Sequence, residues 1–506
     1  MEKGGMIMGI RATIGSATYT CGGQLEAYFR PFRDGTIGRF QPFSTPFGEQ
    51  RLIYADWTAS GRLYQPIEEK LIREFGPFVG NTHTESNVTG TKTTLAYQYA
   101  KEIIKQHVGA GKGDVLLMQG AGMTSAVNKL QRLLGWRVPE RWKPRLTLAD
   151  DERPVVFVTH MEHHSNLLPW VETVAEVVTV RPTDRGDVDL DHLRELLERY
   201  RHRPQKIGAF TACSNVTGLE TPYHQLARLM HEYGGLCFVD FAASAPYVPI
   251  QMHPDDPLET LDAIYFSPHK FLGGPGSAGV LVFDSRLYSQ RAPDHPGGGT
   301  VYWTDPWGHY EYVEAIEERE DGGTPPFWQT IKAALAIQLK EQMNVAKMRA
   351  REKELVSLLL PALQDIPGVH VLEGHRSDRL GIVSFVIEGL HYNLVVKLLN
   401  DRFGIQARGG CSCAGPYGHY LLGIDQEQSA ALLQEVKGGN ILAKPGWVRL
   451  SLHPTMTNEE VYTIIHAVRQ IARHGQRWQE EYEYDAAKNE FVHRGDDRYI
   501  RHFFLV

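Results

Sequence analysis

The stretch DAIYFSPHKFLGGPG, residues 262–276, places a single lysine between a short apolar run and a cluster of glycines. The apolar run, 263–266, is predicted to be a β-strand, so Lys270 follows the carboxyl end of that strand. Ligands of open α/β sheets collect outside such ends, and a lysine whose pKa is lowered there can form a Schiff base. Taken alone, a solvated lysine before a turn is the commoner explanation.

A carboxylate upstream makes the chemical explanation of Lys270 the stronger one. Asp240 directly follows another apolar run, 236–239. A carboxylate against the pyridine nitrogen of pyridoxal phosphate keeps that nitrogen protonated, so the ring withdraws electrons from the substrate's α-carbon. An aspartate that only caps a helix would leave the lysine unexplained. We therefore predict an enzyme that holds pyridoxal 5'-phosphate through Lys270 and Asp240.

The surrounding sequence predicts an α/β fold. From about residue 95 to 285, helical patterns alternate with short runs rich in β-branched residues, which is typical of a mostly parallel sheet. Strands are predicted at 115–118, 154–159, 207–213, 236–239, 263–266 and 279–283, with helices at 191–201 and 221–233. A loop rich in Gly and Pro, 292–307, and a long helical stretch, 327–360, precede a second region with strands at 380–386 and 447–452, joined by the segment around 51–62.

Two polar residues that follow predicted strands are candidates to contact the cofactor ring, one at its face and one at its edge. His163 comes after the strand that ends at Thr159, and its imidazole can lie over the ring. Asn215 comes after the strand 207–213, and its amide can bind the phenolic oxygen of the ring. A polar loop histidine and a turn asparagine are the plain alternatives.

A glycine turn before a helix suits the phosphate. Gly122, Met123 and Thr124 lie between the strand 115–118 and a helix predicted to run through Asn128 and Leu133. The backbone N–H groups and the dipole at a helix N-terminus favour an anion. Ser267 and His269, from the lysine loop, are expected to add hydrogen bonds.

Composition limits the other possibilities. The 506 residues, 42% hydrophobic and 22% charged, are enough for two packed domains, and the net charge of −7 gives no reason to expect a nucleic-acid partner. No apolar run is long enough for a membrane span, and residues 1–23 lack the apolar core of a signal peptide. We expect a cytoplasmic protein without a metal site, whose five cysteines form no disulfide framework.

Motifs in a fixed order carry a family resemblance over about residues 52–471. They are Tyr54-Ala55-Asp56, Glu162-His163-His164-Ser165-Asn166, Ser214-Asn215-Val216-Thr217-Gly218, Val239-Asp240 and Phe266-Ser267-Pro268-His269-Lys270. The sequence resembles class V aminotransferase-fold enzymes, closest to the cysteine desulfurase and selenocysteine lyase group. The resemblance implies a pyridoxal-phosphate-dependent transferase of fold type I, a homodimer, and a phosphate contact from Thr300 of the other subunit.

The fold type also implies a division of the chain. We predict a large cofactor-binding domain at 81–344 and a smaller α+β domain built from 51–80 and 345–475. Residues 1–50 are expected to be an N-terminal extension, and residues 476–506 a tail to which the sequence assigns no chemistry.

The same resemblance implies roles for three further residues. Arg449 matches the arginine that holds the substrate carboxylate, a task to which its planar fork is suited. Arg408 opens the segment that matches the family's active-site cysteine loop, and Cys413 falls at the position that forms a persulfide. Arg408 and Asn215 are also expected to contact the substrate, and Arg408 is the candidate cation nearest to Cys413 in sequence. The implied activity is conversion of L-cysteine to L-alanine, with a sulfur-acceptor protein as possible partner.

Two departures keep other activities open. Cys411 and Ser412 stand where the family loop has a histidine pair, and Ala243 stands where a glutamine usually contacts the phenolic oxygen. The alternatives are an aminotransferase, epimerase or C–S lyase acting on another amino acid and, less favoured, a non-catalytic scaffold. The choice between cysteine and selenocysteine is also left open by the sequence.

Overall fold

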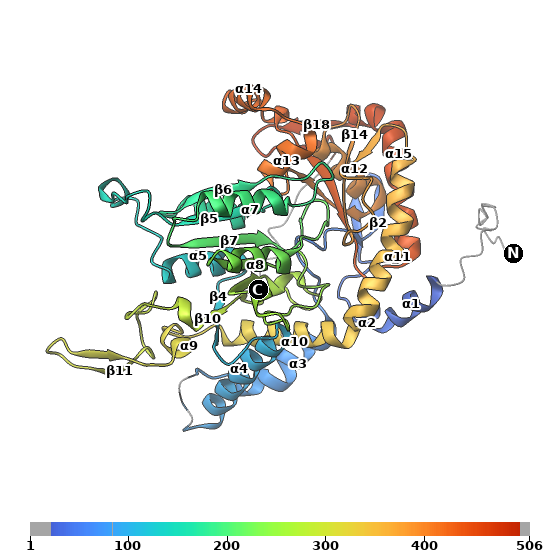
Figure 1. Ribbon diagram of the computed structural model, residues 1–506. Coiled ribbons are helices and arrows are strands. Elements are labelled where there is room, and N and C mark those ends of the chain that lie inside the picture. Colours follow the sequence, from blue (N-terminus) through green and yellow to red (C-terminus); the bar gives the residue numbers. More distant parts are fainter. Residues whose placement is uncertain (1–21, 83, 85, 496–506) are drawn as a thin grey trace.

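The computed structural model describes residues 22–495 except 83 and 85 (Figure 1). Its larger region is built on a seven-stranded sheet with strand order β4-β10-β9-β8-β7-β5-β6. The strands are β4 (Asp114–Gln119), β5 (Val155–Thr159), β6 (Glu176–Val180), β7 (Lys206–Thr211), β8 (Leu236–Asp240), β9 (Ala263–Phe266) and β10 (Gly279–Asp284). Strands β5 to β9 pair in parallel, so the predicted mostly parallel sheet is confirmed.

Strand β10 runs antiparallel to both of its neighbours, β4 and β9. The reason lies in the connection from β9 to β10, which holds a short 3-10 turn, Pro268–Lys270, and no crossover helix. A parallel connection needs a crossover, whereas this chain turns back directly. The lysine loop is thus the reversal itself, which fixes Lys270 at the carboxyl end of β9.

The sheet is buried on both faces, as its continuous apolar strands require. Alternate residues divide between two cores: Val115 and Leu117 pack with helix α5 (Met123–Leu133), whereas Leu116 and Met118 share the other core with α8 (Tyr223–Glu232). The remaining helices of this region are α4 (Val88–His107), α6 (His164–Val171), α7 (Leu190–Arg199), α9 (Ile316–Arg319) and α10 (Phe327–Met343). No helix in the described part of the chain is long and apolar enough to span a membrane.

The predicted helical stretch 327–360 is two helices and not one. Helix α10 ends at Met343 and α11 (Val345–Gln364) begins after Asn344, whose φ of 62° cannot continue a right-handed helix. The side chain of Asn344 then accepts a hydrogen bond from the N–H of Lys347 as an N-cap. The bend directs the chain from the large sheet into the second region, as Figure 1 shows.

The second region contains a four-stranded sheet with order β13-β14-β17-β16. Its strands are β13 (Val369–Val371), β14 (Ile382–Ile387), β16 (Arg408–Gly410) and β17 (Trp447–Ser451), and its helices are α12 (Tyr392–Phe403), α13 (Gly415–Leu422), α14 (Gln426–Lys437) and α15 (Asn458–Trp478). The strands predicted at 380–386 and 447–452 are therefore confirmed as β14 and β17, which pair antiparallel with Val383 opposite Leu450.

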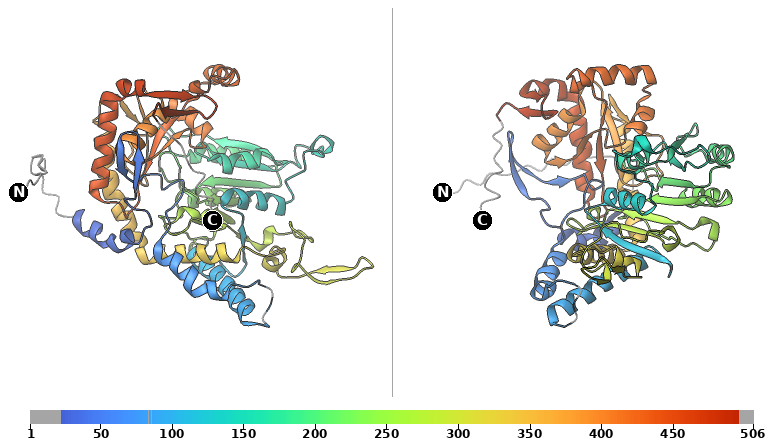
Figure 2. Two further views of the ribbon diagram at one scale, coloured as in Figure 1. Left: turned by 180° about the vertical axis from the view of Figure 1, so that it is seen from behind. Right: turned by 90° about the vertical axis from the view of Figure 1, so that its left-hand side faces the viewer.

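The N-terminal segment joins this second region, although it is far away in sequence. It forms α1 (Gly22–Tyr28), α2 (Arg30–Asp34), β1 (Pro42–Thr45), β2 (Gly48–Arg51) and β3 (Ile53–Tyr54). The helix that follows, α3 (Gln65–Lys70), packs instead on the larger region, where Glu68 pairs with Lys332 of α10 at 2.7 Å. Strand β3 pairs in parallel with β15 (Ile405–Gln406), and the N–H of Ser451 donates to the carbonyl of Ala55 at 2.7 Å. The views in Figure 2 show the N-terminal elements beside the C-terminal helices.

Two hairpins complete the described chain. The predicted loop 292–307 contains β11 (Val301–Thr304), which pairs with β12 (Tyr310–Tyr312) in a hairpin that projects from the body in Figure 1. The tail forms β18 (Tyr482–Asp485) and β19 (Glu490–His493) and packs on α12, where the Tyr482 hydroxyl donates to Asp401 at 3.0 Å. The proposed domain boundaries themselves stay a prediction, and residues 1–21, including Cys21, lie outside the described part.

Candidate active site

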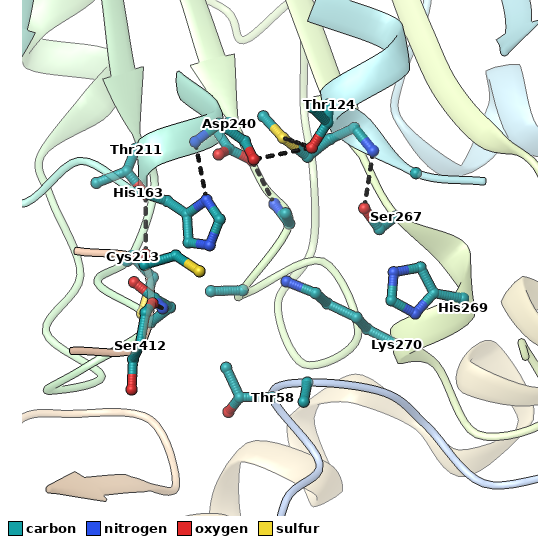
Figure 3. A pocket seen from close by; sticks show the side chains of 18 of the residues that line it. Thr58, Thr124, His163, Thr211, Cys213, Asp240, Ser267, His269, Lys270 and Ser412 are labelled. Atoms are coloured by element: carbon teal, nitrogen blue, oxygen red, sulfur yellow. Dashed lines mark hydrogen bonds between the residues drawn. The ribbon is translucent and has the colours of Figure 1, made fainter. Parts of the chain in front are cut away.

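A cavity of about 440 Å³ opens at the carboxyl ends of the parallel strands (Figure 3). It lies where side chains from the large sheet, the N-terminal segment and the second region meet. The predicted site residues that line it are Gly122, Met123, Thr124, His163, Asn215, Asp240, Ser267, His269, Lys270, Arg408, Cys413 and Arg449. Residues separated by as much as 391 positions in sequence, from Thr58 to Arg449, thus share one cavity.

Lys270 and Asp240 form the electrostatic centre of this cavity. Burial lowers the pKa of Lys270 to about 8, although the negative charge of Asp240 acts in the opposite direction. Burial raises the pKa of Asp240 to about 6, opposed by a hydrogen bond from the N–H of Ala242 at 2.8 Å and by the charge of Lys270. The lysine is therefore an amine that loses its proton at mildly alkaline pH, and the acid is a buried charge that a cationic ring nitrogen would neutralise.

The ring of His163 is held in one orientation by its own backbone. As the N-cap of α6, His163 accepts a hydrogen bond from the N–H of Ser165 through Nδ1 at 3.0 Å. This bond requires that Nε2 carry the proton of the neutral ring. Burial, followed by the charge of Lys270, lowers the pKa of His163 to about 3, so the ring facing the cavity is neutral.

Behind Asp240 lies a second buried acid that the sequence did not single out. Glu162 accepts hydrogen bonds from the hydroxyl of Thr159 at 2.7 Å and from the N–H of Thr211 at 2.9 Å. Its other oxygen accepts from the Asn166 side chain at 2.8 Å. Burial raises the pKa of Glu162 to about 7. This network ties β5, α6 and β7 together beneath the cavity floor.

The glycine turn 122–124 and the lysine loop are in contact where they line the cavity. The N–H of Met123, the first residue of α5, donates to the Ser267 hydroxyl at 2.9 Å. A Cβ at Gly122 would lie 2.9 Å from that hydroxyl and 3.6 Å from His269 Nε2, so this position admits only a backbone. Thr124 donates its hydroxyl to Ser165 at 2.8 Å. A helix N-terminus flanked by hydroxyls and an imidazole suits a phosphate dianion.

The cysteine loop is fastened to the large domain beside the cavity. The Asn215 amide donates to the carbonyl of Ser412 at 2.7 Å, and the N–H of His164 donates to the carbonyl of Cys413 at 2.7 Å. In return, the N–H of Gly415 donates to His164 Nε2 at 2.9 Å. Ser412 and Cys413 have φ of 50° and 56°, a left-handed conformation that non-glycine residues adopt at an energetic cost.

The two predicted substrate arginines are joined by an acid whose role the sequence did not predict. Arg449 Nη2 donates to Asp56 Oδ1 and Arg408 Nε donates to Asp56 Oδ2, each at 3.0 Å. Arg449 Nη1 also donates to the carbonyl of Asn215 at 3.1 Å. The Tyr54-Ala55-Asp56 motif was the only signal for Asp56, because its partners lie more than 350 positions away in sequence.

Further lining residues were also missed by sequence reasoning. Thr58, Ala242 and Cys213 line the cavity. Burial raises the pKa of the Cys213 thiol well above its usual range, which disfavours the reactive thiolate. Cys413, by contrast, is exposed to the cavity.

Thr300 does not line this cavity in the single chain. It is buried, and its hydroxyl donates to the carbonyl of Gly297 at 2.7 Å. The cofactor contact implied for Thr300 comes from another subunit, so its role stays a prediction.

Unpaired polar atoms test whether a cofactor and an amino acid suit the cavity. Asn215 Oδ1, Ser412 Oγ, Thr58 Oγ1 and Arg449 Nε are buried without a hydrogen-bond partner among the described residues. Each such atom costs about 1–3 kcal/mol unless a ligand satisfies it. All four residues line the same cavity as Lys270 and Asp240, so the residues present fit pyridoxal phosphate with a polar substrate.

The amino-acid sequence is similar to those of known pyridoxal-phosphate-dependent enzymes. Residues 53–464 match the family model of the class-V aminotransferases. The chain is 31% identical to a probable cysteine desulfurase of Mycobacterium leprae over 73% of this chain and 84% of the relative. It is 26% identical to a cysteine desulfurase of Haloferax volcanii over 77% and 85% of the two chains.

Solved structures show the same fold. The apo structure of a cysteine desulfurase from Thermococcus onnurineus matches with a TM-score of 0.68 at 23% identity, covering 83% of this chain and 95% of the other. A cysteine desulfurase of Escherichia coli matches with a TM-score of 0.65 at 23% identity, covering 90% and 99%. The chain therefore belongs to the class-V aminotransferase family of pyridoxal-phosphate-dependent enzymes, with the fold type I architecture expected from its sequence.

Proposed function

We propose that this protein is a cysteine desulfurase, which converts L-cysteine to L-alanine and transfers the sulfur to Cys413. The observation that carries the proposal is that Cys413 lines the same cavity as Lys270, Asp240 and Arg449. The similar proteins from Haloferax volcanii and Mycobacterium leprae, a cysteine desulfurase and a probable cysteine desulfurase, support the same reaction. In the sulfur transfer, the carbon–sulfur bond of L-cysteine breaks, a sulfur–sulfur bond forms on Cys413, and alanine is released.

The chain's own residues divide this work among them. Lys270, Asp240, His163, Asn215, Ser267, His269 and the turn 122–124 would hold the cofactor. When bound, pyridoxal phosphate withdraws electrons from the substrate's α-carbon and so lowers the barrier to removal of its proton. Lys270, whose amine is neutral at mildly alkaline pH, then takes that α-proton, while Arg449 holds the substrate carboxylate.

Cys413 is placed to receive the sulfur as a thiolate. Arg449 lines the same cavity as Cys413, so a guanidinium stands near the proposed nucleophile. Arg408 also lines the cavity, and both arginines donate to Asp56. Because His164 and Asn215 hold the loop carbonyls, the nucleophile is presented from a fixed backbone rather than from a free loop.

The matched cysteines of the loop provide the test. The purified holoenzyme, incubated with L-cysteine and a reductant, is expected to release sulfide and alanine in equal amounts. Cys413→Ser should abolish both products while keeping the visible absorbance of the bound cofactor, whereas Cys411→Ser should retain most of the activity. Pyruvate, or a transamination product without sulfide, would instead establish a C–S lyase or an aminotransferase acting through Lys270.

We also propose a homodimer in the cytoplasm that passes its sulfur to an acceptor protein. The hairpin β11–β12 supports the dimer, because Tyr302, Trp303, Trp307 and Tyr310 expose 56–81% of their surface on an arm that projects from the body. A partner's Thr300 would then reach this cavity. Free Cys213, Cys237, Cys411 and Cys413 suit a reducing compartment. Sedimentation of the holoenzyme at twice the chain mass tests the dimer.

A further inference from the structure

We infer that Asp56 is a positioning residue of the substrate site, which holds Arg449 and Arg408 so that Arg449 can bind the substrate carboxylate. The inference rests on the proposed function only in requiring an amino-acid substrate. It does not depend on whether sulfur is transferred.

The two arginines lie directly opposite each other on neighbouring strands. Arg408 in β16 and Arg449 in β17 are register partners of an antiparallel pair. Like charges at such positions repel and destabilise the pairing. The side chain of Arg449 is only 4% exposed, whereas that of Arg408 is 53% exposed. The repulsion is therefore screened poorly on the side of Arg449, where water is excluded.

Asp56 offsets this repulsion with one carboxylate. Its two oxygens contact one arginine each, at 3.0 Å, so the carboxylate bridges the guanidiniums. Its backbone is fixed independently, because Asp56 forms a parallel bridge with Ser451 and the N–H of Ser451 donates to the carbonyl of Ala55. The backbone of Asp56 is thus anchored to β17 at Ser451, two residues after Arg449.

The atoms left unpaired show where the substrate carboxylate would bind. Asp56 and the carbonyl of Asn215 occupy Nη2 and Nη1 of Arg449, whereas Nε has no partner among the described residues. The hydroxyl of Thr58, also buried and unpaired, lines the same cavity. The backbone N–H of Thr58 donates to the hydroxyl of Ser451, the last residue of β17, at 3.0 Å. This bond holds Thr58 beside the strand that carries Arg449. The N-terminal segment therefore supplies both the clamp and a donor for the carboxylate.

Two ligands that differ only in the carboxylate separate positioning from general structural damage. L-Alanine and ethylamine are both primary amines without sulfur, so we expect each to react with the bound cofactor and to change its visible absorbance. In Asp56→Asn, we expect about tenfold or weaker binding of L-alanine and little change for ethylamine. Asp56→Glu, which keeps the charge, should recover part of the alanine affinity. Asp34→Asn, which breaks an exposed pair with Arg30, is the matched control and should bind both ligands normally.

A double-mutant cycle tests the mechanism of the clamp. Once Arg408→Gln removes the repelling charge, the further change Asp56→Asn should weaken alanine binding several-fold less than in the wild-type background. Equal losses for alanine and ethylamine, or equal losses in both backgrounds, would overturn the inference. Tighter alanine binding in Asp56→Asn would also overturn it, because Asp56 would then be a competitor of the substrate. None of these outcomes depends on sulfide release, so failure of the proposed desulfurase reaction is detected separately.

Discussion

The backbone N–H of His164 donates a hydrogen bond of 2.7 Å to the carbonyl of Cys413. The His164 ring accepts a second hydrogen bond from the N–H of Gly415, the first residue of α13, the helix that follows the cysteine loop. His164, at the start of α6, thus forms hydrogen bonds with residues on both sides of Ala414 and holds the cysteine loop in place. The same helix start presents the ring of His163 to the cavity. The cofactor face and the proposed sulfur acceptor are therefore positioned by adjacent residues.

Removing the His164 ring tests this grip. His164→Ala should lower the rate of sulfide release about fivefold, which corresponds to one lost hydrogen bond of about 1 kcal/mol. Binding of L-alanine and the cofactor absorbance should be unchanged, because neither requires Cys413. His192→Ala serves as the control, since His192 also accepts a backbone hydrogen bond, from Arg181 at 3.0 Å, but lies outside the cavity. Identical rates for His164→Ala and the wild type would show that the loop keeps its place without the ring.

The lowered pKa of Lys270 predicts how cofactor attachment depends on pH. Only the neutral amine reacts with the aldehyde of pyridoxal phosphate, so raising the pH increases the reactive fraction until the amine has lost its proton. With a pKa of about 8, the attachment rate of the cofactor-free protein should rise up to about pH 8 and then level off. Absorbance measured after rapid mixing provides the rate. A rate that keeps rising to pH 10, as for a free lysine side chain, would contradict the buried environment of Lys270.

Asp240 should matter for reaction more than for attachment of the cofactor. Asp240→Asn keeps the side-chain shape and an acceptor for the N–H of Ala242, but removes the charge that holds a proton on the ring nitrogen. We expect activity to fall by about a hundredfold or more, while the cofactor remains bound. The check is to compare steady-state turnover with cofactor content measured on the same sample. Near-normal turnover at full occupancy would remove Asp240 from the proposed mechanism.

A single methyl group tests the phosphate end. In Gly122→Ala, the new Cβ lies 2.9 Å from the Ser267 hydroxyl, so that side chain must turn away and release the N–H of Met123. Pyridoxal phosphate should bind roughly tenfold more weakly, because the cradle at the start of α5 is disturbed. Equilibrium dialysis measures this affinity directly. Gly113→Ala, where a Cβ approaches only the Ser285 side chain at 4.0 Å, should retain the wild-type value.

Some features could be predicted locally, because short-range patterns control them. Strand β9 was predicted with its observed bounds, and β8 within one residue, since buried strands have continuous apolar sequences with β-branched residues. Parallel strands place their carboxyl ends at one edge, so Lys270 and Asp240 had to lie near each other once the sheet formed. The antiparallel β10 was not foreseen, because nothing in its own sequence reports the direction in which the preceding loop returns.

The sequence by itself therefore determined the parallel core of the sheet and the lysine and aspartate at its strand ends, because hydrophobic periodicity is encoded over a few residues. Only the tertiary structure decided which groups face each other across the cavity. The contacts of Asp56 with Arg408 and Arg449 span 352 and 393 positions, and that of Asn215 with Ser412 spans 197. Such pairings depend on how the two regions pack against each other, and no local pattern in the chain records that geometry.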